Sequence, residues 1–376
     1  MTRAACLALI ASSLFLAACT ESEPDESTGI AAIADVIGDR APASPPAAAA
    51  RFAAATRAGD VALVDARDLS IVSTTALDDD AALVDLAMDP SGAALYAFVT
   101  DDDGQSGELL RASIAGDVLG PLEHVTWLDG VAHIEREADA TLAFVHGYAD
   151  QWKLLRDDGA PTSSLAMIAP VSLSAGAGSL DLLAADASGA LGLYRVDRAA
   201  SAWPPAAPLD LGHASSALTA QLVDAPRAGD ACASCALTKG WLADVDAGDV
   251  SLRPIDADGL GAPVTIDVGA SGAVIEAAVA RCDGTVTLLL SGAELVVRAR
   301  LDDTGDLAAV DALNMPAPIA PRGPGFSRAW VDLGGDAIAI ATSNGVVVVD
   351  ARPGFAPPAW TSSELRAPLT DVVTRP

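Results

Sequence analysis

The chain has 376 residues, 51% of them hydrophobic, which is enough for a large core and excludes disorder over most of its length. It carries 22 basic and 51 acidic residues, for a formal net charge of −29. This excess of acid excludes nucleic acid as a partner, because binding to the phosphate backbone needs a basic surface.

The first element is a secretory signal. Arg3 precedes an apolar run over residues 4–18, and small residues lead up to Cys19. The run is too short and ends too abruptly to be a membrane-spanning helix. The segment LAAC, Leu16 to Cys19, resembles the lipobox of bacterial lipoproteins. The resemblance implies cleavage of a signal peptide over residues 1–18 and lipidation of Cys19; the alternative is an ordinary cleaved signal with an incidental cysteine.

Residues 19–50 follow as a predicted tether. They contain ESEPDESTG, a short apolar patch and the Pro- and Ala-rich stretch APASPPAAAA, a composition typical of a flexible spacer. Several acyl chains hold a protein to a membrane where one chain does not. We therefore expect attachment to a membrane through lipid. Thr20 stands where the inner-membrane retention signal of enteric bacteria has Asp, so we expect the cell envelope, with the outer membrane or cell surface favoured over the inner membrane.

From Arg51 onward, short apolar runs alternate with turn residues, which predicts an all-β fold. The phrase ALVDLAMDPSGAALYAFV (82–99) reads as strand, turn and strand, and it recurs in looser form over 274–290. Each copy opens with two mostly apolar residues and a polar one. Such polar positions recur about every 48 residues on average, which is within the repeat length of propeller blades. They are Asp85, Asp129, Ser172, Gln221, Glu276, Arg328 and Asp371.

Residues 51–376 thus resemble the seven-bladed β-propellers with YVTN- or WD40-like repeats, although the Gly-His and Trp-Asp marks of WD40 blades are not regular here. The resemblance implies four-stranded antiparallel blades, and the repeat places these at 51–77 with 368–376, 82–120, 126–168, 170–212, 217–268, 273–313 and 325–365. The two copies of VDAR, which contain Asp65 and Asp350, would be third strands of the first and last blades. Residues 368–375 would be an innermost strand of the first blade, so that strands from both termini close the ring.

A channel ring is the first candidate site. First strands of propeller blades line the central channel, so Asp85, Asp129, Glu276 and Asp371 could share a ring, with Arg328 among them. Rings rich in oxygen suit Ca²⁺. The alternative is that a water-filled channel needs polar walls. We expect no cofactor apart from this candidate Ca²⁺.

A disulfide is the second candidate feature. Cys6 leaves with the signal and lipid occupies Cys19, so Cys232, Cys235 and Cys282 remain in an oxidising compartment. We favour a bond between Cys282 and either Cys232 or Cys235, with a bond inside the CASC motif as the next choice. CASC is not followed by the His of a haem c site, and no fourth zinc ligand lies nearby in the sequence.

The sequence contains no GxSxG, P-loop, dinucleotide or HExxH motif. We therefore favour a non-catalytic, monomeric, lipid-anchored module that binds a protein, such as another envelope protein, or another ligand in the envelope or at the cell surface. One alternative is a lactonase-like hydrolase that uses a divalent metal in the channel, but metal-binding Asn is scarce, occurring only at Asn314 and Asn344. A structural role in a larger envelope complex is the other alternative.

Overall fold

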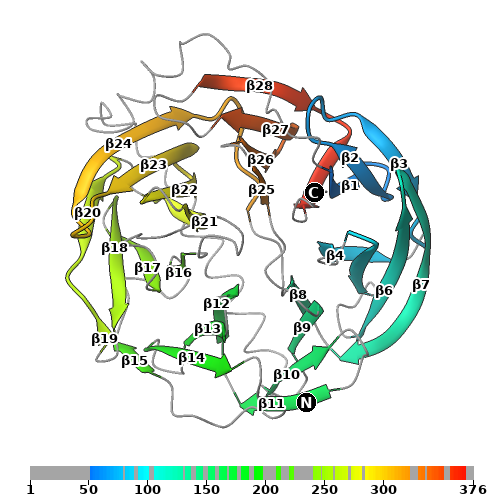
Figure 1. Ribbon diagram of the computed structural model, residues 1–376, viewed down its shortest axis with the longest axis horizontal. Coiled ribbons are helices and arrows are strands. Elements are labelled where there is room, and N and C mark those ends of the chain that lie inside the picture. The colour runs from blue at the N-terminus through cyan, green and yellow to red at the C-terminus, as the bar shows by residue number, and fades with distance from the viewer. Residues whose placement is uncertain are drawn as a thin grey trace, which may run out of the picture.

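The described part of the chain is all-β and consists of the strands β1 to β29 (Figure 1). The computed structural model describes residues 51–78, 81–88, 92–100, 106–129, 132–136, 141–146, 151–156, 161–166, 169–175, 179–185, 190–197, 209–212, 220–223, 240–246, 248–256, 259–269, 272–281, 284–321, 329–334, 337–350 and 356–369. Within these ranges, no helix is long and apolar enough to cross a membrane.

The strands form seven antiparallel sheets that are arranged as blades around a common centre (Figure 1). The first blade, from the centre outward, is β29 (Leu365–Leu369), β1 (Arg51–Thr56), β2 (Val61–Asp65) and β3 (Ile71–Thr75). The second is β4 (Ala82–Met88), β5 (Ala94–Thr100), β6 (Ser106–Ala115) and β7 (Val118–Asp129). The third is β8 (Ala132–Arg136), β9 (Thr141–His146), β10 (Gln151–Arg156) and β11 (Pro161–Ala166).

The remaining four blades follow the same order. The fourth is β12 (Ala169–Ala175), β13 (Ser179–Ala185), β14 (Leu191–Asp197) and β15 (Leu209–Gly212). The fifth is β16 (Gln221–Leu222), β17 (Trp241–Asp246), β18 (Asp249–Asp256) and β20 (Val264–Asp267), with β19 (Gly259–Leu260) also paired to β18. The sixth is β21 (Val274–Ala280), β22 (Thr285–Ser291), β23 (Leu295–Leu301) and β24 (Leu307–Asn314). The seventh is β25 (Trp330–Gly334), β26 (Ala337–Thr342), β27 (Gly345–Asp350) and β28 (Ala356–Ser362).

The core lies between neighbouring blades. One cluster packs β17 and β18 against β21, β22 and β23, and another packs β1 and β2 against β25, β26 and β27. Middle strands such as β5 and β26 are therefore buried on both faces, and the run Val346–Val349 is at most 4% exposed. This burial explains why such strands are continuously apolar, because the blades on both sides cover them.

The ring is closed by both ends of the described domain, as the sequence predicts. β29 pairs with β1 in antiparallel register, and Leu365 and Leu369 are fully buried between the first and last blades. The Arg366 side chain donates a hydrogen bond to the carbonyl of Thr56, and the amide of Arg57 donates one to the carbonyl of Glu364. The first blade is thus built from two segments at opposite ends of the chain.

The two VDAR copies are third strands of the first and last blades, so this prediction is confirmed. Two boundaries are wrong. The closing strand is Leu365–Leu369, earlier than the predicted 368–376, because the last blade already ends at Ser362. The second blade continues to Asp129, beyond the predicted residue 120, because β6 and β7 form a long hairpin.

Candidate functional site

Four of the repeated polar positions, Asp85, Ser172, Gln221 and Glu276, lie on innermost strands, and three of these strands have a β-bulge there. The register of β4 with β5 shifts between Leu83 and Asp85, that of β12 with β13 between Pro170 and Ser172, and that of β21 with β22 between Ile275 and Ala277. A bulge turns a strand locally and re-aims its side chains. The repeat noticed in the sequence therefore corresponds to a repeated irregularity of the backbone.

Two carboxylates of the predicted channel ring, Asp85 and Glu276, lie on innermost strands and are buried. Asp85 is 0% exposed, and its Oδ1 accepts a hydrogen bond from the amide of Leu86 at 2.9 Å. Glu276 is 6% exposed, and its Oε1 accepts a hydrogen bond from the hydroxyl of Ser291 at 2.5 Å. Both carboxylates therefore have bonds to their own blades.

Ser172 and Gln221 occupy the equivalent positions in the fourth and fifth blades. The hydroxyl of Ser172 accepts a hydrogen bond from the amide of Leu222 at 3.1 Å, which joins the innermost strands β12 and β16. Gln221 is buried beside this link. The Ser172 hydroxyl thus connects neighbouring blades near the centre of the ring.

The other predicted site residues are placed differently. Asp129 ends β7, the outermost strand of its blade, so its expected position on an innermost strand is wrong. Asp371 and Arg328 lie outside the described residues, and so do Cys19, Cys232, Cys235 and Cys282. The ring, the lipidation and the disulfide stay predictions. Among the residues that the structure describes, no three His, Cys, Asp or Glu side chains lie together in a way that could hold a metal ion.

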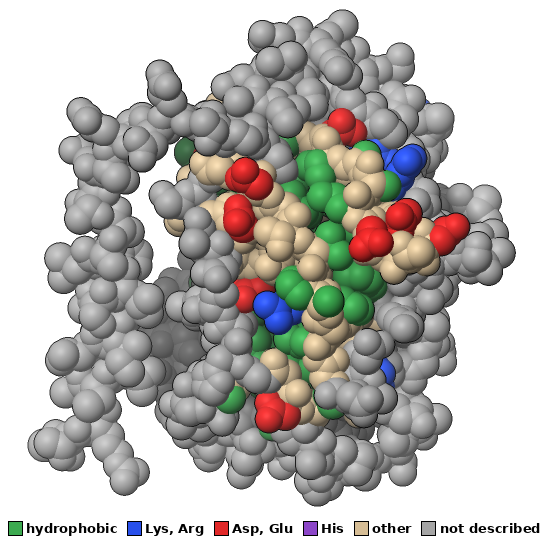
Figure 2. All heavy atoms as spheres, turned by 90° about the vertical axis from the view of Figure 1, so that its left-hand side faces the viewer, with side chains coloured by type: hydrophobic (Ala, Val, Ile, Leu, Met, Phe, Trp, Pro, Cys, Tyr) green, Lys and Arg blue, Asp and Glu red, His purple; other side chains and the backbone are tan. Residues whose placement is uncertain are grey.

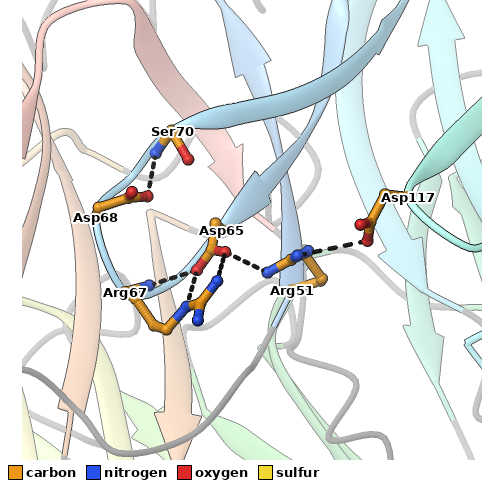
Figure 3. A network of polar contacts seen from close by, with 6 residues as sticks. All are labelled: Arg51, Asp65, Arg67, Asp68, Ser70 and Asp117. Carbon is orange, nitrogen blue, oxygen red and sulfur yellow. Dashed lines mark hydrogen bonds and ion pairs between the residues drawn. The ribbon is translucent and has the colours of Figure 1, made fainter.

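An ionic network at the outer part of the first blade was not anticipated (Figure 3). Asp65, at the end of β2, accepts hydrogen bonds from Arg51 at 2.5 Å and from Arg67 at 2.6 Å, and Arg51 also reaches Asp117 at 3.4 Å. The hydrogen bonds from Arg67, against the opposing effect of burial, lower the pKa of Asp65 from 3.8 to about 2. Because Asp117 lies in the turn between β6 and β7, the network joins the first blade to the second.

An exposed cluster on the second blade was also missed. Glu108 of β6 lies opposite Trp127 of β7, and Nδ1 of His124 is 2.6 Å from Oε1 of Glu108. The rings of His124 and Trp127 have centroids 5.1 Å apart. Trp127 is 69% exposed. The sequence signal for this cluster is the segment EHVTW, residues 123–127, which holds a histidine and a tryptophan three positions apart.

The side of the ring formed by the fifth and sixth blades carries exposed acidic residues. Figure 2 shows the side formed by β18, β20, β23 and β24, where acidic side chains surround an area of hydrophobic ones and basic side chains are fewer. In the turn between β23 and β24, Asp302, Asp303 and Asp306 are all exposed. Oδ1 of Asp302 accepts hydrogen bonds from the amides of Thr304 and Asp306, and these bonds, with the one from the Thr304 hydroxyl, lower the pKa of Asp302. These carboxylates stabilise their own turn.

Comparison with known structures shows a shared fold at low sequence identity. A protein of unknown function from Desulfotomaculum acetoxidans is similar with a TM-score of 0.60 and 13% identity, covering 86% of this chain and 99% of that one. A Bacteroides uniformis protein provisionally named as a 6-phosphogluconolactonase has a TM-score of 0.54 and 13% identity, over 80% and 92% of the two chains. The WD40 domain of coronin from Toxoplasma gondii has a TM-score of 0.51 and 12% identity, over 85% and 76%.

The chain has the β-propeller fold. No family model matches the sequence, and no curated protein matches it. The sequence identity to these three structures is only 12 to 13%. The similarity therefore shows a shared architecture and does not indicate a shared activity.

Proposed function

We propose that this propeller is a non-catalytic interaction module, anchored to the bacterial cell envelope by lipid on Cys19, that presents its acidic outer surface to another envelope protein. The observation that carries the proposal is the burial of Asp85 and Glu276, which are bonded to their own blades and almost without contact with solvent. A catalytic carboxylate must reach a substrate, within hydrogen-bond distance of the atom on which it acts. These two carboxylates stabilise the inner strands instead.

The anchoring is tested by fractionation of cells that express the full chain. We expect the wild type in the membrane fraction, labelled by radioactive palmitate, and the Cys19→Ser variant unlabelled in the soluble periplasmic fraction. Cys6→Ser is the matched control and should behave as the wild type, because Cys6 lies inside the predicted signal. A Cys19→Ser variant that stays labelled and in the membrane would contradict the proposal.

The partner is sought by crosslinking in intact cells. We expect a crosslinked species of defined mass that forms with both the wild type and Cys6→Ser. If the chain crosslinks to no other envelope protein, and purified chain instead turns over a lactone or another ester, the module is an enzyme and the proposal is wrong.

A calcium-dependent hydrolase is the second candidate, because Asp85 and Glu276 occupy equivalent positions on innermost strands. Calorimetry on chelator-treated protein, titrated with Ca²⁺, tests this candidate. Binding in the wild type that is lost in Glu276→Gln, with Glu294→Gln as the control in an outer turn, would favour the hydrolase. The interaction module predicts no heat that depends on Glu276.

A further inference from the structure

The cluster of Glu108, His124 and Trp127 lies on one face of the hairpin because of a β-bulge. Residues three apart on a regular strand point to opposite faces. In β7, Thr126 pairs with Leu109 and His124 pairs with Leu110, so Val125 is an extra residue. The extra residue restores His124 to the face of Trp127 and Glu108. Val125 itself packs against the hydrophobic cluster on the opposite side of the blade.

This face of the second blade looks toward the first blade, yet the first blade covers only one end of it. β3 has five residues and β7 has twelve. The hydroxyl of Ser73, in the middle of β3, accepts a hydrogen bond from the amide of Leu119, near the start of β7. From Leu119 to Trp127, β7 pairs with six residue steps of β6 and so extends about 20 Å at roughly 3.3 Å per step, whereas β3 reaches only about 7 Å to either side of Ser73. The end of β7 that carries Trp127 therefore extends beyond the end of β3.

The exposed end also points away from the start of the domain. Arg51, where the described chain begins, contacts Asp117 in the turn that precedes β7. Trp127 lies at the other end of the strand, more than about 20 Å away. The Trp127 end is therefore separate from the point where the tether joins the domain, and its occupant would be the protein partner of the proposed function. This step rests on the proposed function.

The chemistry of the cluster favours a cation. An indole ring attracts a cation to its face, and the attraction of Trp exceeds that of other aromatic rings. The carboxylate of Glu108, whose side chain is 22% exposed, lies beside the ring and is held by His124. The net charge of −29 attracts basic ligands over a longer distance. Exposed Trp residues that are fixed by their neighbours are also the typical centres of interfaces.

We propose that Trp127, Glu108 and His124 form a docking site for a basic segment of a partner protein, in which an Arg or Lys side chain stacks on the indole and pairs with Glu108. His124 is a positioning residue, because it contacts both the ring and the carboxylate. The site lies on an outermost strand and is separate from the channel positions.

The test measures binding of a fluorescent peptide of alternating Arg and Ser to the full-length protein in mild detergent at physiological ionic strength. We expect Trp127→Ala to weaken binding about tenfold, as loss of a central interface residue does. Glu108→Gln should weaken it by about threefold, as expected for one partly exposed charge pair. Val118→Ala is the matched control, because Val118 is 63% exposed at the other end of β7, and it should leave the affinity unchanged.

Four outcomes would overturn the site. Equal binding by the wild type and Trp127→Ala, or no binding of the Arg peptide by the wild type, removes the proposed role of the indole. Equally tight binding of a peptide with Gln in place of Arg removes the role of the cation. Binding to anionic phospholipid vesicles that depends on Trp127 assigns the surface to a membrane instead. None of these variants affects the Cys19 fractionation, so failure of this site and failure of the anchored module are distinguished.

Discussion

The guanidinium of Arg51 lies 2.5 Å from the carboxylate of Asp65, at the point where the first described strand meets the second. Asp65 is 4% exposed, and Arg67 approaches it from the following turn (Figure 3). Two cations thus compensate one buried anion. The Asp65 carboxylate therefore contributes more to the free energy of unfolding than a member of a surface ion pair would.

Replacing this carboxylate should destabilise the domain. We expect Asp65→Asn to lower the free energy of unfolding by about 2 kcal/mol, because it removes charged hydrogen bonds from a buried acceptor and leaves Arg51 with only its longer contact to Asp117. Urea unfolding followed by circular dichroism measures the change. Asp117→Asn is the control, because Asp117 is 62% exposed and lies 3.4 Å from Arg51, so its loss should have little effect. Equal stability of Asp65→Asn and wild type would contradict this interpretation.

The same network predicts how stability depends on pH. Since the pKa of Asp65 falls from 3.8 to about 2 on folding, its contribution is complete above the unfolded value and is lost as the pH falls through the folded value. The free energy of unfolding should therefore decline more steeply between about pH 4 and pH 2 in the wild type than in Asp65→Asn. Denaturant titrations at several pH values measure the two slopes, and parallel slopes would show that Asp65 titrates normally.

Removing the hydrogen bond between Ser291 and Glu276 should lower the free energy of unfolding, because the Glu276 carboxylate is buried. Ser291→Ala removes the donor to a carboxylate that is 6% exposed, and we expect a cost of about 1 to 2 kcal/mol. Ser363→Ala, in the exposed turn after β28, should change the free energy of unfolding little. If both variants unfold at the same urea concentration as the wild type, the Glu276 carboxylate does not depend on Ser291.

β29, the strand that closes the ring, should contribute as much to the free energy of unfolding as any other strand of the core. Leu369→Ala should cost about 3 kcal/mol, because Leu369 is fully buried between the first and last blades. Leu307→Ala is the control on an outer strand, because Leu307 is 37% exposed, and its loss should cost less than about 1 kcal/mol. A Leu369→Ala variant that unfolds like Leu307→Ala would mean that β29 can detach without loss of the fold.

The sequence predicts the architecture well where blades have regular lengths. Val346–Val349 and the VDAR copies identify third strands, because a strand covered on both faces tolerates only apolar residues before its polar turn. The β-bulges explain how polar residues can recur at corresponding positions of buried innermost strands. A residue beside a bulge can be polar in a buried strand when the chain supplies its hydrogen bond, as the amide of Leu86 does for Asp85.

The wrong boundary of the second blade and the wrong position of Asp129 both come from the hairpin of β6 and β7. WLD at Trp127 to Asp129 has the same pattern as the start of an innermost strand, two mostly apolar residues and a polar one, so the repeat count assigned it to the next blade. A repeat count cannot distinguish an apolar residue that faces the core from one that faces solvent. Trp127 is exposed because β3 is shorter than β7, and this difference in length between neighbouring blades is a property of tertiary structure.

The closure of the ring has a mechanical consequence for a chain held at its N-terminus. A pull transmitted to Arg51 acts along the axis of β1, which is paired with β2 on one side and with β29 on the other. Such a pull loads the hydrogen bonds of both pairings together, in shear, instead of opening them one at a time. The strand that receives the load is therefore clamped on both edges, and its second clamp comes from the opposite end of the chain.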